Sequence, residues 1–105
     1  MRAVVISVEG TFQVVEFPDV YAGVREALGG GWLELVPVSQ QLSVYCDEEG
    51  KLKGLPANKV AHALFGGKLQ AFDVLVGPIV VLGPADEEGD ETEVPEWFIK
   101  EVCHV

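Results

Sequence analysis

The first stretch of the chain is dominated by apolar, β-branched positions that are typical of β-strands. Residues 2–8 read Arg-Ala-Val-Val-Ile-Ser-Val, and residues 11–17 read Thr-Phe-Gln-Val-Val-Glu-Phe. β-Branched and aromatic side chains fit a pleated, half-buried surface well. Only Glu9-Gly10 separates the two segments, and so short a spacer predicts a β-hairpin.

Two further apolar runs, at residues 32–38 and 42–46, predict a second pair of strands. Pro37 lacks a backbone N–H, so the first run is expected at a sheet edge or to end early. Residues 79–82 predict a fifth strand, alone or as half of a bent pair with residues 74–76. In the fourth strand, alternation places Leu42, Val44 and Cys46 on one face and Ser43, Tyr45 and Asp47 on the other.

The apolar spacing changes to a helical period after Pro18-Asp19. Asp19 is a good N-cap residue, and Gly29 suits the left-handed position that follows a helix. Gly23 inside this helix costs about 1 kcal/mol relative to alanine. The predicted buried face consists of Val20, Val24, Ala27 and Leu28.

A second helix is expected after Pro56 and ends at Gly66-Gly67. Asn58 and His62 lie one turn apart on a different face from the apolar stripe, and we expect His62 to be exposed. Asn58 has two possible roles: it can cap the helix, or it can take part in recognition together with His62. The predicted buried stripe consists of Ala57, Val60, Ala61 and Leu64.

A short third helix is expected within residues 94–105, the C-terminal helix and tail, with Pro95 at a tolerated first-turn position. The two tryptophans, Trp32 and Trp97, lie in apolar periodic segments and are expected in the core. The apolar face of this helix consists of Val94, Trp97, Phe98 and Val102.

The predicted order of elements is ββαββαβα, in a single domain over residues 1–105. Two hairpin-like pairs with helices between them favour an α+β fold. We expect an antiparallel or mixed sheet of about five strands and two to three helices, with one face of the sheet covered. Regular βαβ alternation is absent from this order, so a doubly wound fold is not expected.

The charge of the chain narrows the classes of partner. It has 105 residues, with 17 acidic against 7 basic residues and a net charge of −10. Phosphate binding needs lysine and arginine, so neither direct nucleic-acid binding nor an anionic membrane surface is expected. No segment resembles a signal peptide or a membrane span, so we expect an intact cytoplasmic protein, monomeric or homodimeric.

The residue types that usually carry chemistry are few and scattered. Cys46 and Cys103 are expected to be reduced, as small buried hydrophobes. Cys46, Cys103, His62 and His104 lack the close spacing of metal ligands. A Cys–His nucleophile is not indicated, because neighbouring carboxylates raise the pKa of a thiol. We therefore expect no catalytic residues, no metal and no cofactor, although an enzyme assembled from residues distant in sequence is not excluded.

Acidic residues are concentrated in two places. Residues 47–50, Asp-Glu-Glu-Gly, are expected to form a solvated turn. Residues 84–93 form an acidic loop, expected to be exposed, that can serve solubility or the start of the last helix. Alternatively, the loop can present phosphate-like charge to a basic protein surface. The candidate partner-binding residues are Asp86, Glu87, Glu88, Asp90, Glu91 and Glu93.

One motif in the second half of the chain is more specific. Residues 54–61 read Gly-Leu-Pro-Ala-Asn-Lys-Val-Ala, after the acidic turn at 47–50 and before Val-Gly-Pro-Ile-Val-Val-Leu-Gly at 76–83. These stretches resemble the family called domain of unknown function 3846. The resemblance covers residues 3–83, most clearly 44–83, and does not extend into the tail.

The resemblance implies an origin in a mobile element, because members of that family are small proteins or modules of bacteriophages, plasmids and actinobacteria. Related modules occur inside large phage and plasmid proteins suspected of countering host defence. No activity is assigned to the family, so the resemblance implies none for this chain.

The leading hypothesis is a non-enzymatic phage or mobile-element accessory protein that binds a host protein through its acidic surface. Such a surface can act as a decoy for DNA against a host nuclease. The alternative is a small-ligand or nucleotide-binding module, in which the closely spaced cations would hold an anion. The residues of that alternative site are Lys51, Lys53, Asn58 and His62.

Overall fold

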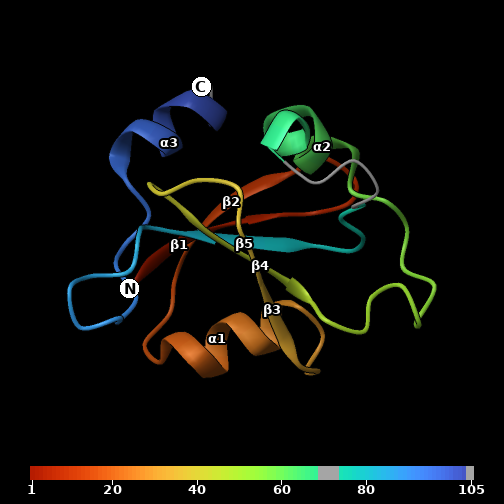
Figure 1. The fold of residues 1–105 in the computed structure, drawn as a ribbon, viewed down its shortest axis with the longest axis horizontal. Coiled ribbons are helices and arrows are strands. Elements are labelled where there is room, and N and C mark those ends of the chain that lie inside the picture. The colour runs from red at the N-terminus through yellow and green to blue at the C-terminus, as the bar shows by residue number, and fades with distance from the viewer. Residues whose placement is uncertain (69–73, 104–105) are drawn as a thin grey trace.

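A five-stranded antiparallel sheet lies at the centre of the molecule (Figure 1). The computed structural model describes residues 1–68 and 74–103. The order of elements agrees with the predicted order ββαββαβα, with one additional short 3₁₀ turn at Gly66–Lys68. The strands are β1 (Arg2–Ile6), β2 (Phe12–Glu16), β3 (Leu33–Val36), β4 (Ser43–Asp47) and β5 (Ile79–Leu82).

The sheet consists of two hairpins joined by the last strand. β1 pairs with β2 and β3 pairs with β4, as the sequence predicts. β5 lies between the hairpins, in the strand order β2-β1-β5-β4-β3. Val81 of β5 is in register with Val4 of β1 on one side and with Val44 of β4 on the other. The last strand in the sequence therefore lies at the centre of the sheet.

Helices cover both faces of the sheet, so the expectation of one covered face is wrong. α1 (Val20–Ala27) lies on one face, and α2 (Lys59–Phe65) and α3 (Glu96–Val102) lie on the other (Figure 1). All four residues of β5 are buried, with no exposed surface. A central strand that is apolar on both sides must be covered on both sides to be removed from water.

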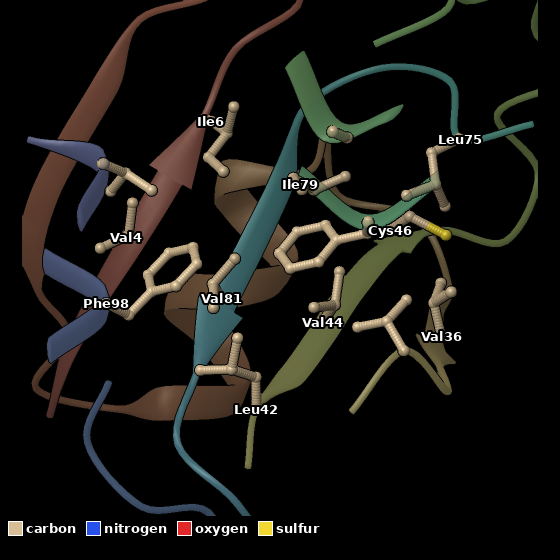
Figure 2. Packing of buried hydrophobic residues seen from close by; sticks show 14 of the residues in the cluster. Val4, Ile6, Val36, Leu42, Val44, Cys46, Leu75, Ile79, Val81 and Phe98 are labelled. Carbon is tan, nitrogen blue, oxygen red and sulfur yellow. The ribbon is translucent and has the colours of Figure 1, made fainter. Parts of the chain in front are cut away.

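The two faces carry separate hydrophobic cores. The larger core lies between the sheet and α2 and α3, where Phe98 and the strand residues Val4, Val44 and Val81 pack together (Figure 2). The rings of Phe65 and Phe98 stack within it. The smaller core lies under α1 and consists of Ala3, Val24, Leu28, Val80 and Leu82.

Two predicted helix caps are confirmed. The Asp19 side chain accepts a hydrogen bond from the backbone N–H of Ala22, and the Asn58 side chain accepts one from Ala61. Gly29 adopts the left-handed conformation after α1, with φ of 103°. Each cap satisfies a backbone group that the first or last turn of a helix leaves without an internal partner.

Three predictions of burial are wrong. Trp32 and Trp97 are 61% and 46% exposed, and Ala57 is exposed because α2 begins only at Lys59. Cys46 is buried as predicted, whereas Cys103 is only partly buried. Trp32, Ala57 and Cys103 lie just outside the ends of β3, α2 and α3, because apolar periodicity does not fix where an element begins or ends.

Within the described residues, no helix combines the length and the apolar character needed to cross a membrane. The end of the predicted C-terminal tail, residues 104–105, lies outside the described residues.

Candidate functional site

A cavity of about 290 Å³ opens on the face of the sheet that α1 covers. Three elements and the acidic loop surround it: α1, β3, β4 and Glu91 of the loop. Its walls are mostly aliphatic or aromatic. We call it the Glu91 cavity, and its lining residues are Val20, Tyr21, Val24, Leu33, Tyr45 and Glu91.

The carboxylate of Glu91 is only half satisfied. Its Oε1 accepts a hydrogen bond from the phenolic hydroxyl of Tyr45, which projects from the α1 side of β4. Its Oε2 is shielded from solvent and has no hydrogen-bond partner among the described residues. A shielded polar atom without a partner costs the fold free energy, so it is a point where a ligand can contribute a missing bond. The expectation that the acidic run is wholly exposed is therefore wrong at Glu91.

The same contact alters the acidity of Tyr45. Burial raises the pKa of the Tyr45 hydroxyl above its usual value of 10.0, and the hydrogen bond to Glu91 and the nearby negative charge raise it further. All three effects disfavour a phenolate. Tyr45 therefore stays protonated and remains a hydrogen-bond donor to Glu91 throughout the physiological pH range.

The acidic loop is held in a defined conformation by its own hydrogen bonds. The side chain of Asp86 accepts bonds from the backbone N–H groups of Glu88 and Asp90, each at 2.9 Å. At the base of the loop, the hydroxyl of Thr92 donates to the carbonyl of Pro84. Asp86 is itself exposed, and so are three neighbouring acidic residues whose side chains the turn does not use. We call these three the loop tip: Glu87, Glu88 and Asp90.

The last acidic residues of the run tie the loop to the start of β1. Glu93 accepts a bond of 2.8 Å from the backbone N–H of Arg2, and Glu96 forms a 3.1 Å ion pair with the Arg2 guanidinium. Of the six predicted partner-binding residues, Asp86, Glu91 and Glu93 thus have contacts within the chain. The loop tip supplies the exposed carboxylates that make no such contact in the described part of the chain.

Asp47 is buried, contrary to the expectation of a solvated turn. It is only 5% exposed. Its carboxylate pairs with Lys53 at 2.7 Å and accepts a 2.9 Å bond from the backbone N–H of Glu49. Burial raises the pKa of this carboxyl, but the bonds from Lys53 and Glu49 and the charge of Lys53 outweigh that effect, so the pKa is lowered. Asp47 therefore stays charged and fixes the turn.

Asn58 has no polar atom left for a ligand. Its Nδ2 donates to the carbonyls of Ile6 and Gly77 at 3.1 and 3.0 Å, and its Oδ1 accepts from the N–H of Ala61 at 3.0 Å. The residue has no exposed surface. These bonds join α2 to β1 and to the approach to β5, so the capping role is the one that the structure realises.

The other members of the alternative ligand site do not surround a common space. Nε2 of His62 accepts a 2.9 Å bond from the backbone N–H of Leu75, and His62 is partly buried, so its predicted exposure is wrong. Lys53 is paired with Asp47. Lys51 lines a separate cavity of about 230 Å³ together with Cys46. The four predicted residues have individual positions in the fold and do not form one pocket.

In the described parts of the chain, no group of three or more histidine, cysteine or acidic side chains is arranged to hold a metal ion. The Cys46 thiol donates to Oε1 of Glu34 at 3.6 Å.

The family model described as Domain of unknown function (DUF3846) matches residues 1–104. The chain belongs to this family. The DUF3846 match extends beyond residue 83, where the sequence resemblance was expected to end, so the acidic loop and α3 are parts of the family domain. No curated protein and no solved structure gives a significant match to this DUF3846 chain.

Sequence reasoning on this DUF3846 domain missed most of the Glu91 cavity. The sequence predicts Glu91 as a surface residue, and it predicts only the helix or strand positions of four other lining residues: Val20, Val24, Leu33 and Tyr45. One signal was available, since Tyr45 is an aromatic residue with a polar tip on the opposite strand face from Val44. Nothing in the sequence links position 45 to position 91, because that contact depends on how the acidic loop folds back.

Proposed function

We propose that this protein is a non-enzymatic accessory protein of a phage or other mobile element, which binds a host protein through the acidic loop. The observation that carries the proposal is the fixed loop tip. Glu87, Glu88 and Asp90 face solvent together, on a turn held by Asp86 and anchored at Glu91. A run that served solubility alone would not need such internal order.

Internal order matters for binding because a flexible loop loses conformational entropy when a partner fixes it. A loop that is already ordered avoids much of that cost. Exposed charge of one sign also speeds encounter with a surface of opposite sign and disfavours wrong partners. The loop therefore combines two properties that suit recognition of a basic protein surface.

The partner class that fits this chemistry is an enzyme with a basic nucleic-acid channel. Closely spaced carboxylates offer such a channel the negative charge that it otherwise receives from phosphates. In this proposal the chain acts as a decoy for DNA. The same chemistry explains why the net charge of −10 makes direct DNA binding by the chain itself unfavourable.

The test compares two charge-reversal variants that change the net charge equally. The loop-tip variant carries Glu87→Lys, Glu88→Lys and Asp90→Lys. The control variant carries Glu9→Lys, Glu26→Lys and Glu101→Lys, which replace exposed glutamates outside the loop. Tagged wild type and both variants are incubated with host lysate at about 0.1 M and about 1 M salt, between which the Debye length falls from about 10 Å to about 3 Å. Bound proteins are then identified by mass spectrometry.

We expect the wild type and the control variant to retain the same nucleic-acid enzyme at low salt, and the loop-tip variant to lose it. High salt should release it, and DNA should compete with the wild type for it. A partner that both variants retain would overturn the role of the loop, and a partner that DNA does not displace would overturn the decoy mechanism. Equal thermal unfolding of the three proteins is the control for folding.

The alternative of a nucleotide-binding module has less support. It needs Asn58 and His62 to contact an anion, and both are already bonded within the chain. A thermal-shift screen with nucleotides remains its direct test, because binding at 100 times Kd adds about 2.7 kcal/mol of stability.

A further inference from the structure

We propose that the Glu91 cavity is an anchor pocket that receives an arginine side chain of the partner protein. This inference rests on the proposed function, since it names the group by which the basic partner is held. The cavity adjoins the loop tip through Glu91 itself, which is its carboxylate wall and directly follows Asp90 in the acidic loop. Steering by the loop and anchoring in the cavity would thus act on one partner surface.

The first argument is the unpartnered Oε2 of Glu91. Tyr45 donates to Oε1 and leaves the second oxygen without a donor in the described residues. Rotation about the last torsion of a glutamate is soft, so the carboxylate can turn an oxygen toward a donor in the cavity. An arriving N–H group would supply the missing bond, and a cationic donor would also neutralise the charge.

The second argument is the character of the walls. Val20, Val24 and Leu33 are aliphatic, and Tyr21 and Tyr45 are aromatic. The guanidinium of arginine is flat and weakly hydrated, stacks on aromatic rings and pairs with carboxylates through several N–H groups. Its aliphatic stem can lie along apolar walls. The ammonium of lysine is strongly hydrated and loses more on entering such a space, so the cavity favours arginine.

The third argument is that the chain cannot fill the cavity with its own arginines. The sequence contains two, Arg2 and Arg25. Arg2 pairs with Glu96, and the Nε of Arg25 donates to the carbonyls of Gly30 and Gly31 while its guanidinium lies over the Trp32 ring. Both arginines of the chain are thus engaged elsewhere, and the cavity can receive an arginine of another protein.

The test uses three capped tripeptides as probes of the whole chain: acetyl-Gly-Arg-Gly-amide, its lysine analogue and its citrulline analogue. Citrulline has nearly the shape of arginine but no charge. Binding is followed by NMR through the methyl groups of Val20, Val24 and Leu33, which line the cavity. We expect saturable methyl shifts with the arginine peptide, and binding weaker by about tenfold or more with the other two.

Variants distinguish the cavity from the loop. Glu91→Gln should weaken arginine-peptide binding about tenfold, whereas Glu88→Gln, which removes the same charge from the exposed tip, should change it less than about twofold. Tyr21→Ala removes an exposed wall of the cavity and should weaken binding about threefold. If Glu91→Gln fails to fold, the arginine and citrulline peptides on the wild type decide the question alone.

Each result has a defined meaning. Equal binding of arginine and citrulline, or no shift of the cavity methyl groups, overturns the anchor pocket and leaves Glu91 as a residue that pins the loop. If arginine and lysine peptides instead shift the amides of the loop tip equally, the anchor fails while the acidic-loop function stands. If the cavity binds arginine but the loop-tip variant still captures its partner from lysate, the proposed function fails and the pocket stands.

Discussion

Asn58, beside α2, and Glu91, beside α1, are polar groups shielded in opposite halves of the molecule. Every polar atom of the Asn58 side chain is bonded to backbone, on β1, on α2 and before β5. Glu91 has one bond, to Tyr45, and one shielded oxygen without a partner in the described residues. Both residues were predicted as candidate binding residues, and the structure separates them by how completely each is satisfied.

The difference teaches how a shielded polar group can be interpreted. A group whose bonds are all made within the chain contributes to stability and has nothing left to offer a ligand. A group with a missing bond costs stability, and such costs are found in native proteins where a partner or substrate completes the site. Asn58 is therefore a structural residue and Glu91 is the candidate for recognition. Four experiments test this contrast.

The largest effect is expected at Asn58. Asn58→Ala leaves the carbonyls of Ile6 and Gly77 and the N–H of Ala61 without their partners. Unsatisfied buried groups cost about 1–3 kcal/mol each, so we expect the free energy of unfolding to fall by about 3–5 kcal/mol. Urea unfolding measures it. A loss below about 1 kcal/mol, less than one unsatisfied buried group costs, would mean that Asn58 does not tie α2 to the sheet.

A smaller effect is expected at Tyr45. Tyr45→Phe removes the only hydrogen bond that Glu91 accepts in the described residues. Bonds to charged groups contribute about 1.5–3 kcal/mol, so we expect the free energy of unfolding to fall by about that amount. The fold raises the pKa of Tyr45, so it favours the protonated hydroxyl. The stability from this preference is fully present below the pKa of an unfolded tyrosine, about 10, and is lost as the pH rises above it.

The pH dependence provides the control for Tyr45. Between about pH 10 and pH 11.5, wild type should lose stability more steeply than Tyr45→Phe, measured by urea unfolding at each pH. Parallel curves would show that folding does not raise the pKa of the Tyr45 hydroxyl.

A third experiment separates capping from the rest of the role of Asn58. Asp19 caps α1 through one exposed bond to the N–H of Ala22, at 3.1 Å. Asp19→Ala should therefore cost only about 1 kcal/mol in the same unfolding measurement. The loss of unfolding free energy in Asn58→Ala beyond that in Asp19→Ala measures the two bonds that Nδ2 of Asn58 makes to β1 and to Gly77. Equal losses at the two positions would reduce Asn58 to an ordinary helix cap.

The smallest effect is expected when both members of the half-satisfied pair are replaced. In Tyr45→Phe with Glu91→Met, no polar atom of the pair remains to be satisfied, and such double replacements are nearly neutral or stabilising. We expect a change within about 0.5 kcal/mol of wild type, together with loss of arginine-peptide binding. A loss of 2 kcal/mol or more, by the scale of about 1.5–3 kcal/mol for one charged bond, would identify the pair as structural.

Local sequence signals identified the elements well because their causes are local. The Asp19 and Asn58 caps, the left-handed Gly29 and the alternation along β4 each involve residues a few positions apart. Gly23 is an exception. Glycine lowers helix stability, but a larger residue at this position would bring its side chain against the ring of Phe17. The glycine permits α1 to pack closely against the end of β2.

The sequence by itself determined the order of the elements, the α+β class, the helix caps, the acidity of the loop and membership of its family, since these follow from periodicity, capping chemistry, composition and motif. Only the tertiary structure decided that β5 is central, that both sheet faces are covered, that Asp47 is buried and that Glu91 meets Tyr45. The reason is physical: burial and long-range hydrogen bonds depend on which distant segments pack together, and residues 45 and 91 become neighbours only when the acidic loop folds back over the sheet.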